Sequence, residues 1–133
     1  MEQKKLSVMI VDDDKFLLGM YSLKFQNNGL EAEAVLGSVE ALKKLREGAN
    51  PDILLLDIIM PYMTGLELLK TIREENLASR SVVIMLTNQS ESSDIEAAKA
   101  LGVEGYIVKA STIPSEVLTE VLKIYEKNKA KKK

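Results

Sequence analysis

The sequence predicts an α/β domain in which five βα units build a parallel, doubly wound sheet with helices on both faces. Three observations lead to this prediction. Short apolar runs recur five times at fairly even spacing, amphipathic helical patterns lie between the runs, and residues that end helices follow several of these patterns. Strands that alternate with helices in this way are typical of a parallel sheet.

The five apolar runs are the expected strands. They cover Leu6–Val11, Ala32–Leu36, Ile53–Leu56, Val82–Leu86 and Tyr106–Val108. The third run consists of aliphatic residues alone. Such an unbroken run is typical of a central strand that is buried on both faces.

Amphipathic stripes predict the helices between the strands. The first stripe has the i, i+3, i+4, i+8 spacing of one helical face, at Leu17, Met20, Tyr21 and Phe25. The last stripe shows the helical spacing more clearly, at Val117, Leu118, Val121, Leu122 and Tyr125. Shorter stripes fill the other gaps, at Val39 with Leu42, at Leu66 with Leu69 and Ile72, and at Ile95 with Ala98.

Helix ends are marked by residues with suitable backbone or capping chemistry. Candidate stops are Asn28-Gly29, Gly48 and Gly102. Ser38 and Ser90 are candidate N-caps, because a serine hydroxyl can accept a hydrogen bond from the first turn. Pro114 suits the first turn of the last helix, where its missing N–H costs nothing.

Length and composition limit the chemistry. A chain of 133 residues fits one domain. Cysteine is absent, which excludes disulfides, thiol nucleophiles and thiolate metal sites, and the absence of histidine removes the commonest acid–base group. The remaining groups are carboxylates, hydroxyls, amines and backbone, so a bound metal would be a hard cation such as Mg²⁺.

The two ends of the chain are polar. The N-terminus, Met1-Glu-Gln-Lys-Lys, lacks the apolar core of a signal peptide, and no stretch approaches the ~20 apolar residues of a membrane span. We therefore expect a cytoplasmic protein without membrane insertion. The domain is expected to cover residues 1–126, followed by a basic, disordered tail at 127–133. The net charge of −2 argues against a nucleic-acid-binding surface.

Polar side chains follow four of the five expected strands. Asp12-Asp13-Asp14, Asp57, Thr87 and Lys109 stand at these strand ends. Ligands of open parallel sheets bind at the carboxyl ends of the strands, so these phosphate-compatible groups are expected to share one site. Each also has a structural explanation: Asp14 can cap the next helix, Thr87 can begin a loop, and Lys109 can be a solvated loop residue.

Four segments together resemble the response-regulator receiver family of two-component signalling. They are Val8-Met-Ile-Val-Asp-Asp-Asp, Leu54-Leu-Leu-Asp-Ile-Ile-Met-Pro-Tyr-Met-Thr-Gly, Val83-Ile-Met-Leu-Thr and Gly105-Tyr-Ile-Val-Lys. The resemblance covers about residues 6 to 126, and its Asp-x-x-Met-Pro-x-Met-x-Gly motif is highly specific. It implies a flavodoxin-like strand order 2-1-3-4-5 and a single-domain, chemotaxis-type receiver.

The resemblance also implies a role for each site residue. Asp57 would be the nucleophile that becomes an aspartyl phosphate, which makes the chain a phosphoprotein of a phosphorelay. Asp12 and Asp13 would hold Mg²⁺ together with Asp57 and the backbone carbonyl of Ile59, and the cation would relieve the repulsion of three carboxylates. Lys109 would place a positive charge on a phosphate oxygen.

Two further residues would act as the switch. Thr87 would donate a hydrogen bond to the attached phosphate, and the ring of Tyr106 would turn inward as Thr87 moves. The structural explanation of Tyr106 is a ring that is half packed on the sheet edge with a solvated hydroxyl, and it is compatible with the switch role.

Some residues depart from the family pattern. Ala110 replaces the proline that usually follows the strand-five lysine, often in a cis peptide, so either a costly cis bond is kept or the loop is rearranged. Asn88 is larger than the residue usually found after the conserved threonine, which narrows the path to Asp57. Ile59 and Gln89 occupy variable positions that influence the lifetime of the phosphate.

The implied partners are a sensor histidine kinase or phosphotransfer protein upstream and a target protein downstream. Output is expected through the surface of helix four, strand five and helix five, with no direct contact to nucleic acid, because the sequence ends about six residues after the last expected helix. The chain is not expected to be an enzyme beyond promoting its own phosphoryl transfer and dephosphorylation.

Two other functions remain open. A receiver-like interaction module that no longer accepts phosphate is kept open by Asn88 and Ala110, although the intact set of Asp12, Asp13, Asp57, Thr87 and Lys109 argues against it. A haloacid-dehalogenase-type phosphatase is suggested by Asp12-x-Asp14 after the first strand. That second family needs another acidic pair after the lysine, and downstream only Glu116, Glu120 and Glu126 are found, all on the last helix.

Overall fold

The structure is a computed structural model that describes residues 5–129. Five strands alternate with five α-helices, and a short 3-10 turn precedes the last helix. Their bounds are β1 Ser7–Asp12, α1 Lys15–Asn27, β2 Glu31–Leu36, α2 Ser38–Arg46, β3 Ile53–Leu56, α3 Gly65–Glu74, β4 Val82–Thr87, α4 Ser92–Ala100, β5 Gly105–Val108, η1 Lys109–Ser111 and α5 Pro114–Asn128. Each strand begins and ends within one residue of its predicted bounds.

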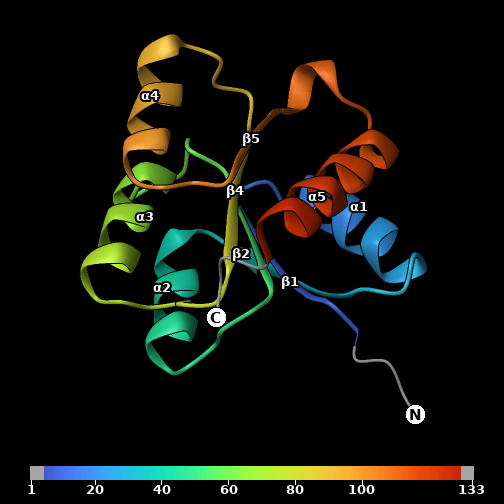
Figure 1. Cartoon of the computed structure of the whole chain (residues 1–133), viewed down its shortest axis with the longest axis horizontal. Coiled ribbons are helices and arrows are strands. Elements are labelled where there is room, and N and C mark those ends of the chain that lie inside the picture. The colour runs from blue at the N-terminus through green and yellow to red at the C-terminus, as the bar shows by residue number, and fades with distance from the viewer. Residues whose placement is uncertain (1–4, 130–133) are drawn as a thin grey trace.

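The strands form one parallel sheet in the order β2-β1-β3-β4-β5. Helices α1 and α5 cover one face, and α2, α3 and α4 cover the other (Figure 1). The predicted fold class and strand order are therefore confirmed. Because all strands run the same way, their carboxyl ends lie along one edge of the sheet, as the pairing of Thr87 with Val108 illustrates.

The central strand β3 feeds two hydrophobic cores, one on each face of the sheet. Ile53 and Leu55 pack on the α1–α5 side, whereas Leu54 and Leu56 pack on the α2–α4 side. All four side chains are fully buried. Burying one such side chain stabilises the fold by about 1.5–3 kcal/mol, so the aliphatic run predicted from the sequence is a main source of stability.

Two predicted helix caps are wrong. Helix α2 begins at Ser38 itself after Gly37, which has φ 90°, and the Ser38 hydroxyl donates to the carbonyl of Met63 at 2.6 Å instead of capping. Helix α4 is preceded by Glu91 rather than Ser90. Pro114 does stand in the first turn of α5, as predicted.

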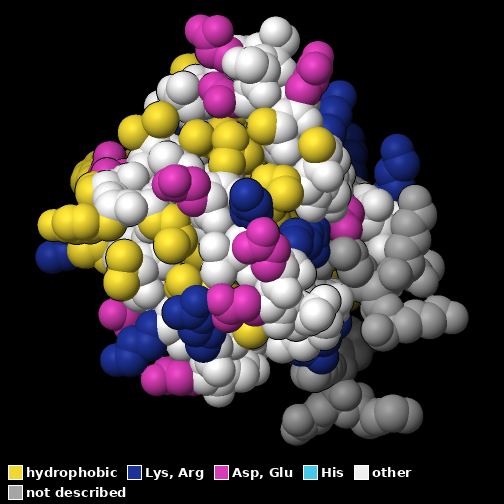
Figure 2. Space-filling view, turned by 90° about the vertical axis from the view of Figure 1, so that its left-hand side faces the viewer, with side chains coloured by type: hydrophobic (Ala, Val, Ile, Leu, Met, Phe, Trp, Pro, Cys, Tyr) yellow, Lys and Arg dark blue, Asp and Glu magenta, His cyan; other side chains and the backbone are white. Residues whose placement is uncertain are grey.

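Helix α4 is held less firmly than its neighbours. Ala98 is its one fully buried residue, and no side chain caps its first turn. At its other end, the Arg73 guanidinium of α3 donates to the carbonyls of Leu101 and Gly102, at 2.9 and 3.0 Å. Figure 2 looks onto α2, α3 and α4 and shows hydrophobic side chains gathered toward its left and across its upper half.

The last helix continues past the predicted domain boundary. Helix α5 ends at Asn128, two residues beyond 126, and the side-chain amide of Asn128 donates to the carbonyl of Ile124 at 2.8 Å. Residues 130–133 of the predicted tail lie outside the described residues, so the disorder of the tail remains a prediction. Within residues 5–129, every helix is too short or too polar to cross a membrane.

Candidate functional site

The predicted site residues meet around a hollow of about 230 Å³ at the carboxyl edge of the sheet. Asp12 ends β1, Asp57 follows β3, Thr87 ends β4 and Lys109 follows β5. The hollow is lined by Asp12, Asp13, Asp14, Leu17, Asp57, Ile59, Thr87, Asn88, Gln89 and Lys109. Of the residues predicted for the site or its switch, Tyr106 alone lies outside this lining.

The loop after β3 approaches the backbone of Asp57 very closely. The Asp57 N–H donates to the carbonyl of Val11 at 3.1 Å, which fixes the acid beside β1. The Gly65 N–H donates to the carbonyl of Ile58 at 2.8 Å, and a Cβ at Gly65 would overlap the carbonyl oxygen of Asp57. Glycine at this position therefore allows the loop to close against the site.

Lys109 bridges two buried carboxylates. Its Nζ lies 2.6 Å from Asp12 Oδ2 and 3.0 Å from Asp57 Oδ2, and the three side chains are 7%, 3% and 10% exposed. Burial opposes the lysine charge, but the hydrogen bond to Asp12 and the charges of both carboxylates outweigh it and raise the pKa of Lys109. Burial also raises the pKa of Asp12, which the contact with Lys109 only partly offsets.

The three acids fit a hard divalent cation. Asp12, Asp13 and Asp57 each offer a carboxylate oxygen, and these oxygens lie within 4.8 Å of one another. Asp12 and Asp57 are buried, whereas Asp13 is exposed, so a cation entering from solvent meets it first. An all-oxygen donor set that is open to water on one side is the chemistry that Mg²⁺ prefers.

Thr87 and Tyr106 both contact Gln89. The Thr87 hydroxyl oxygen is fully buried and accepts from the Gln89 N–H at 3.3 Å. The Tyr106 hydroxyl donates to the Gln89 carbonyl at 2.6 Å, and its ring packs against the core. The ring of Tyr106 is thus half packed, as its structural explanation expects, and its hydroxyl donates to a backbone carbonyl. The switch role of Tyr106 stays a prediction. Gln89 was predicted only as a variable residue near the phosphate, and its backbone role depends on a loop geometry that sequence does not specify.

The residues that depart from the family pattern can now be placed. No cis peptide bond occurs among residues 5–129, so the Lys109–Ala110 bond is trans, and Lys109–Ser111 forms a 3-10 turn. The side chain of Asn88 is exposed at the rim of the hollow. Ile59 also lies at the rim and is 56% exposed. The loop after β5 is thus the rearranged alternative.

The acids that a phosphatase of the dehalogenase type would use are otherwise engaged. Asp14 Oδ1 accepts the N–H groups of Phe16 and Leu17, at 2.9 and 3.1 Å, and so caps α1. Glu116 and Glu120 border a different hollow, on α5. Among the described residues, no acid that follows Lys109 lines the hollow at the carboxyl edge.

Sequence reasoning did not connect Tyr21 with the site. Its side chain is buried in the α1–α5 core, where it was predicted only as part of a helical stripe. Burial raises its pKa, and the charges of Lys109, Asp12 and Asp57 also act on it. No sequence pattern announces this proximity, because it depends on how α1 lies across the sheet.

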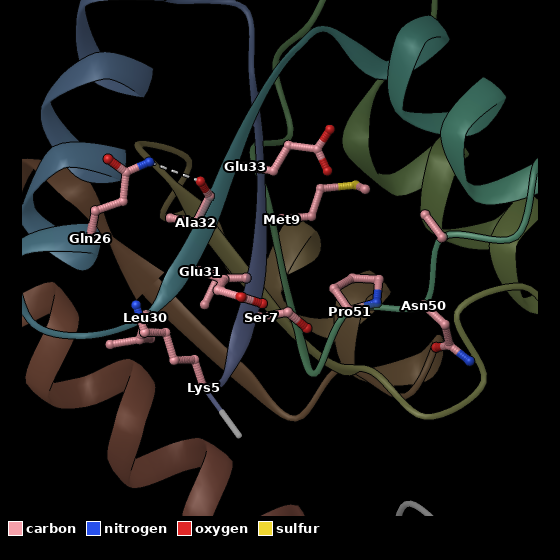
Figure 3. Close-up of a pocket in the computed structure, with 12 residues that line it drawn as sticks. Lys5, Ser7, Met9, Gln26, Leu30, Glu31, Ala32, Glu33, Asn50 and Pro51 are labelled. Carbon is pink, nitrogen blue, oxygen red and sulfur yellow. Dashed lines mark hydrogen bonds between the residues drawn. The ribbon is translucent and has the colours of Figure 1, made fainter. Parts of the chain in front are cut away.

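A larger hollow, of about 540 Å³, lies at the opposite edge of the sheet. Figure 3 shows Glu31 and Glu33 of β2 beside it, with the Gln26 amide bonded to the carbonyl of Ala32. The cluster of three acids is nevertheless at the carboxyl edge. Chemistry rather than size therefore locates the candidate site in the smaller hollow.

Comparison with known proteins identifies the family. A family model described as the response regulator receiver domain matches residues 8–123. The phosphate regulon transcriptional regulatory protein PhoB of Rhizobium meliloti is 31% identical over 107 residues, which are 80% of this chain and 47% of that protein. The chain spans about half the length of the curated relatives it matches.

Solved structures agree with the family model. The chemotaxis protein CheY4 of Vibrio cholerae superimposes with a TM-score of 0.82 at 30% identity, covering 91% of this chain and 99% of that one. A CheY-like receiver domain protein from Methanospirillum hungatei has a TM-score of 0.86 at 24% identity, over 96% and 99% of the two chains, and shows the shared fold. The chain belongs to the response regulator receiver domain family of two-component signalling.

Proposed function

We propose that this domain is the phosphoacceptor of a phosphorelay and that Asp57 takes the phosphoryl group. The observation that carries the proposal is the pair of oxygens on Asp57. One oxygen accepts the Ile58 N–H at 2.7 Å, and the other lies 3.0 Å from Lys109 Nζ, beside Asp12 and Asp13. A carboxylate with a fixed orientation, next to a cation and a metal-binding acid pair, is suited to nucleophilic attack on phosphorus.

The residues of the site would divide the work. Asp12, Asp13, Asp57 and the backbone carbonyl of Ile59 would hold Mg²⁺, which when bound neutralises charge on the transferring phosphoryl group. A carboxylate oxygen of Asp57 forms the new O–P bond, and the P–N bond to the histidine of the donor breaks, leaving its electron pair on the imidazole. Lys109 remains within reach of a phosphoryl oxygen and compensates its charge.

The switch would follow from the same contacts. Thr87 Oγ1 accepts the N–H groups of Gln89 and Ile58, at 3.3 and 3.4 Å, which leaves the hydroxyl hydrogen to donate to the phosphoryl group. A movement of Thr87 would shift the Gln89 backbone, because the Gln89 N–H donates to the Thr87 hydroxyl. The Gln89 carbonyl in turn accepts the hydrogen bond of the Tyr106 hydroxyl. Phosphorylation would therefore stabilise the conformation in which the ring of Tyr106 is turned inward. That change would alter the surface made by α4, β5 and α5.

The partners follow from this chemistry. A sensor histidine kinase or a phosphotransfer protein would supply the phosphoryl group, and a target protein would read the α4–β5–α5 surface without direct contact to nucleic acid. Since such donors draw on ATP, we place the chain in the cytoplasm. It would catalyse only its own phosphorylation and dephosphorylation.

Intact mass spectrometry after incubation with Mg²⁺ and acetyl phosphate tests the proposal. We expect the mass of one added phosphoryl group in the parent chain, and none when EDTA replaces Mg²⁺ or when Asp57→Asn is used. Asp14→Asn is the matched control, because asparagine caps a helix as well as aspartate and the variant should label normally. Labelling that survives undiminished in Asp57→Asn would instead favour the phosphatase alternative.

A further inference from the structure

A continuous depression runs along α2 beside the loop between β3 and α3. It consists of two adjoining hollows of about 420 and 400 Å³ that share Val39. Pro61 and Tyr62 border the first, and Lys43 and Met63 border the second. We call these two hollows the α2 groove. They belong to the face that carries exposed hydrophobic side chains in Figure 2.

Exposed apolar side chains form part of the walls of the groove. Val39 is 59% exposed and Tyr62 99% exposed. Tyr62 has φ 69°, a conformation that bulky residues rarely adopt, and the Met63 N–H donates to the carbonyl of Pro61 at 2.7 Å across it. The buried Ser38 hydroxyl bonds the same loop to the start of α2. The backbone on either side of Tyr62 is therefore held by hydrogen bonds, and the Tyr62 side chain projects into solvent beside the hollow.

Some charged side chains of α2 form ion pairs and others do not. Lys44 pairs with Glu33 at 3.0 Å, and Arg46 pairs with Glu75. Glu40 and Lys43, by contrast, line the groove and make no ion pair within residues 5–129. They stand three residues apart, so they are neighbours on one helix face.

The charges along the groove allow the same surface of two copies to pair. In a two-fold pair every contact occurs twice, and residue i of one copy faces residue j of the other. If two α2 helices run antiparallel about an axis between Ala41 and Leu42, Glu40 of each copy faces Lys43 of the other. Tyr62 borders the groove of its own copy and is fully exposed, so it is available to the second copy in such a pair.

We propose that two copies of this chain associate through the α2 groove in a two-fold dimer. Glu40 and Lys43 supply reciprocal ion pairs, and Tyr62 and Val39 supply the buried apolar contact. The surface lies apart from α4, β5 and α5, and the association requires no phosphoryl group. Asp13 borders both this groove and the Asp57 hollow, so the association is measured on the unphosphorylated chain in EDTA, where the function proposed for Asp57 is not exercised.

Sedimentation equilibrium of the whole unphosphorylated chain, from low to high micromolar concentration, tests the proposal. We expect the apparent molar mass to rise toward that of two chains. Tyr62→Ser should raise the dissociation constant about a hundredfold, since an aromatic anchor is worth about tenfold or more and occurs twice in the dimer. Leu23→Ser is the matched control, because Leu23 on α1 is 58% exposed and remote from the groove.

Exchanging the charges of Glu40 and Lys43 tests the proposed ion pairs directly. Lys43→Glu and Glu40→Lys should each weaken the dimer about tenfold or more by opposing like charges, and the double variant should return to within about threefold of the parent chain. A chain that stays monomeric throughout the range overturns the proposal. So does a dimer that Tyr62→Ser and Lys43→Glu leave unchanged, because it would use another face.

Discussion

Aspartates at the two edges of the sheet have opposite surroundings. At the amino edge, Asp52 precedes β3, and its Oδ2 accepts both the N–H and the hydroxyl of Ser7, at 2.9 and 3.1 Å. At the carboxyl edge, Asp12 and Asp57 share one cation, Lys109. The amino edge thus satisfies a single carboxylate with Ser7 and with the Arg80 guanidinium, 3.6 Å away, whereas the carboxyl edge concentrates like charges.

This difference separates stability from function. A carboxylate whose lone pairs are met by neighbouring N–H and O–H groups contributes to folding, as Asp52 does by tying β1 to β3. Carboxylates that repel one another gain most from a cation. The acids at the carboxyl edge are therefore expected to cost stability until a metal is bound.

The largest expected effect is on metal binding. Asp13→Ala should weaken Mg²⁺ binding about a hundredfold or more, because even the loss of a group that only orients a metal ligand costs about ten- to a hundredfold. Isothermal titration calorimetry with Mg²⁺ measures the dissociation constant of each protein. Since Asp13 also repels its neighbours, the variant should be more stable than the parent chain in EDTA. An unchanged Mg²⁺ titration would place the metal elsewhere.

The second effect concerns the amino edge. Asp52→Ala should lower the free energy of unfolding by about 1–3 kcal/mol, because it leaves the partly buried Ser7 N–H without its acceptor. Denaturation in urea, with and without Mg²⁺, measures the loss. We expect equal losses under both conditions. A loss of unfolding free energy that depends on Mg²⁺ would show that the amino edge is not independent of the metal site at the carboxyl edge.

The third effect concerns the lifetime of the phosphorylated state. Ile59 stands two residues past Asp57 at the rim of the hollow, where it can shield the attacking water but cannot bind it. Ile59→Asn should therefore speed dephosphorylation about tenfold, which corresponds to ~1.4 kcal/mol in the barrier. Decay of the labelled protein in Mg²⁺ after removal of the donor gives the rate. Equal rates for the two proteins would show that Ile59 merely packs on the neighbouring loop.

The smallest effect is a dependence of stability on alkaline pH. The pKa of Lys109 is raised in the folded chain, so its ion pairs stabilise the fold fully below the unfolded value of about 10.4 and are lost as pH rises through the higher folded value. The stability difference between the parent chain and Lys109→Met, measured in EDTA, should therefore shrink in strongly alkaline buffer. A difference that stays constant there would contradict the assigned pairing.

The strands and the grouping of the site residues were predictable from the sequence. Apolar runs such as Ile53–Leu56 have one stable place, buried between two helical layers, and the rule that parallel strands share a carboxyl edge brings Asp12, Asp57 and Lys109 together. The roles of these residues remain predictions until phosphorylation is measured.

Other features were not predictable because they depend on partners distant in the sequence. The Ser38 hydroxyl fails as a cap because Met63, 25 residues away, accepts its hydrogen bond. The Tyr106 hydroxyl is satisfied by the Gln89 carbonyl, 17 residues away. In each case the local pattern allowed two conformations, and tertiary packing selected one.

The sparse anchoring of α4 has a consequence for hydrogen exchange. The anchors of this helix are the buried Ala98 and the hydrogen bonds from the Arg73 guanidinium to the carbonyls of Leu101 and Gly102. Because these anchors are few, the helix can open while the sheet stays intact. Its amides should then exchange by local opening at a small free energy, whereas those of α3, with Leu68, Leu69 and Ile72 buried, exchange only when the whole domain unfolds. The helix can therefore be reshaped without loss of the fold.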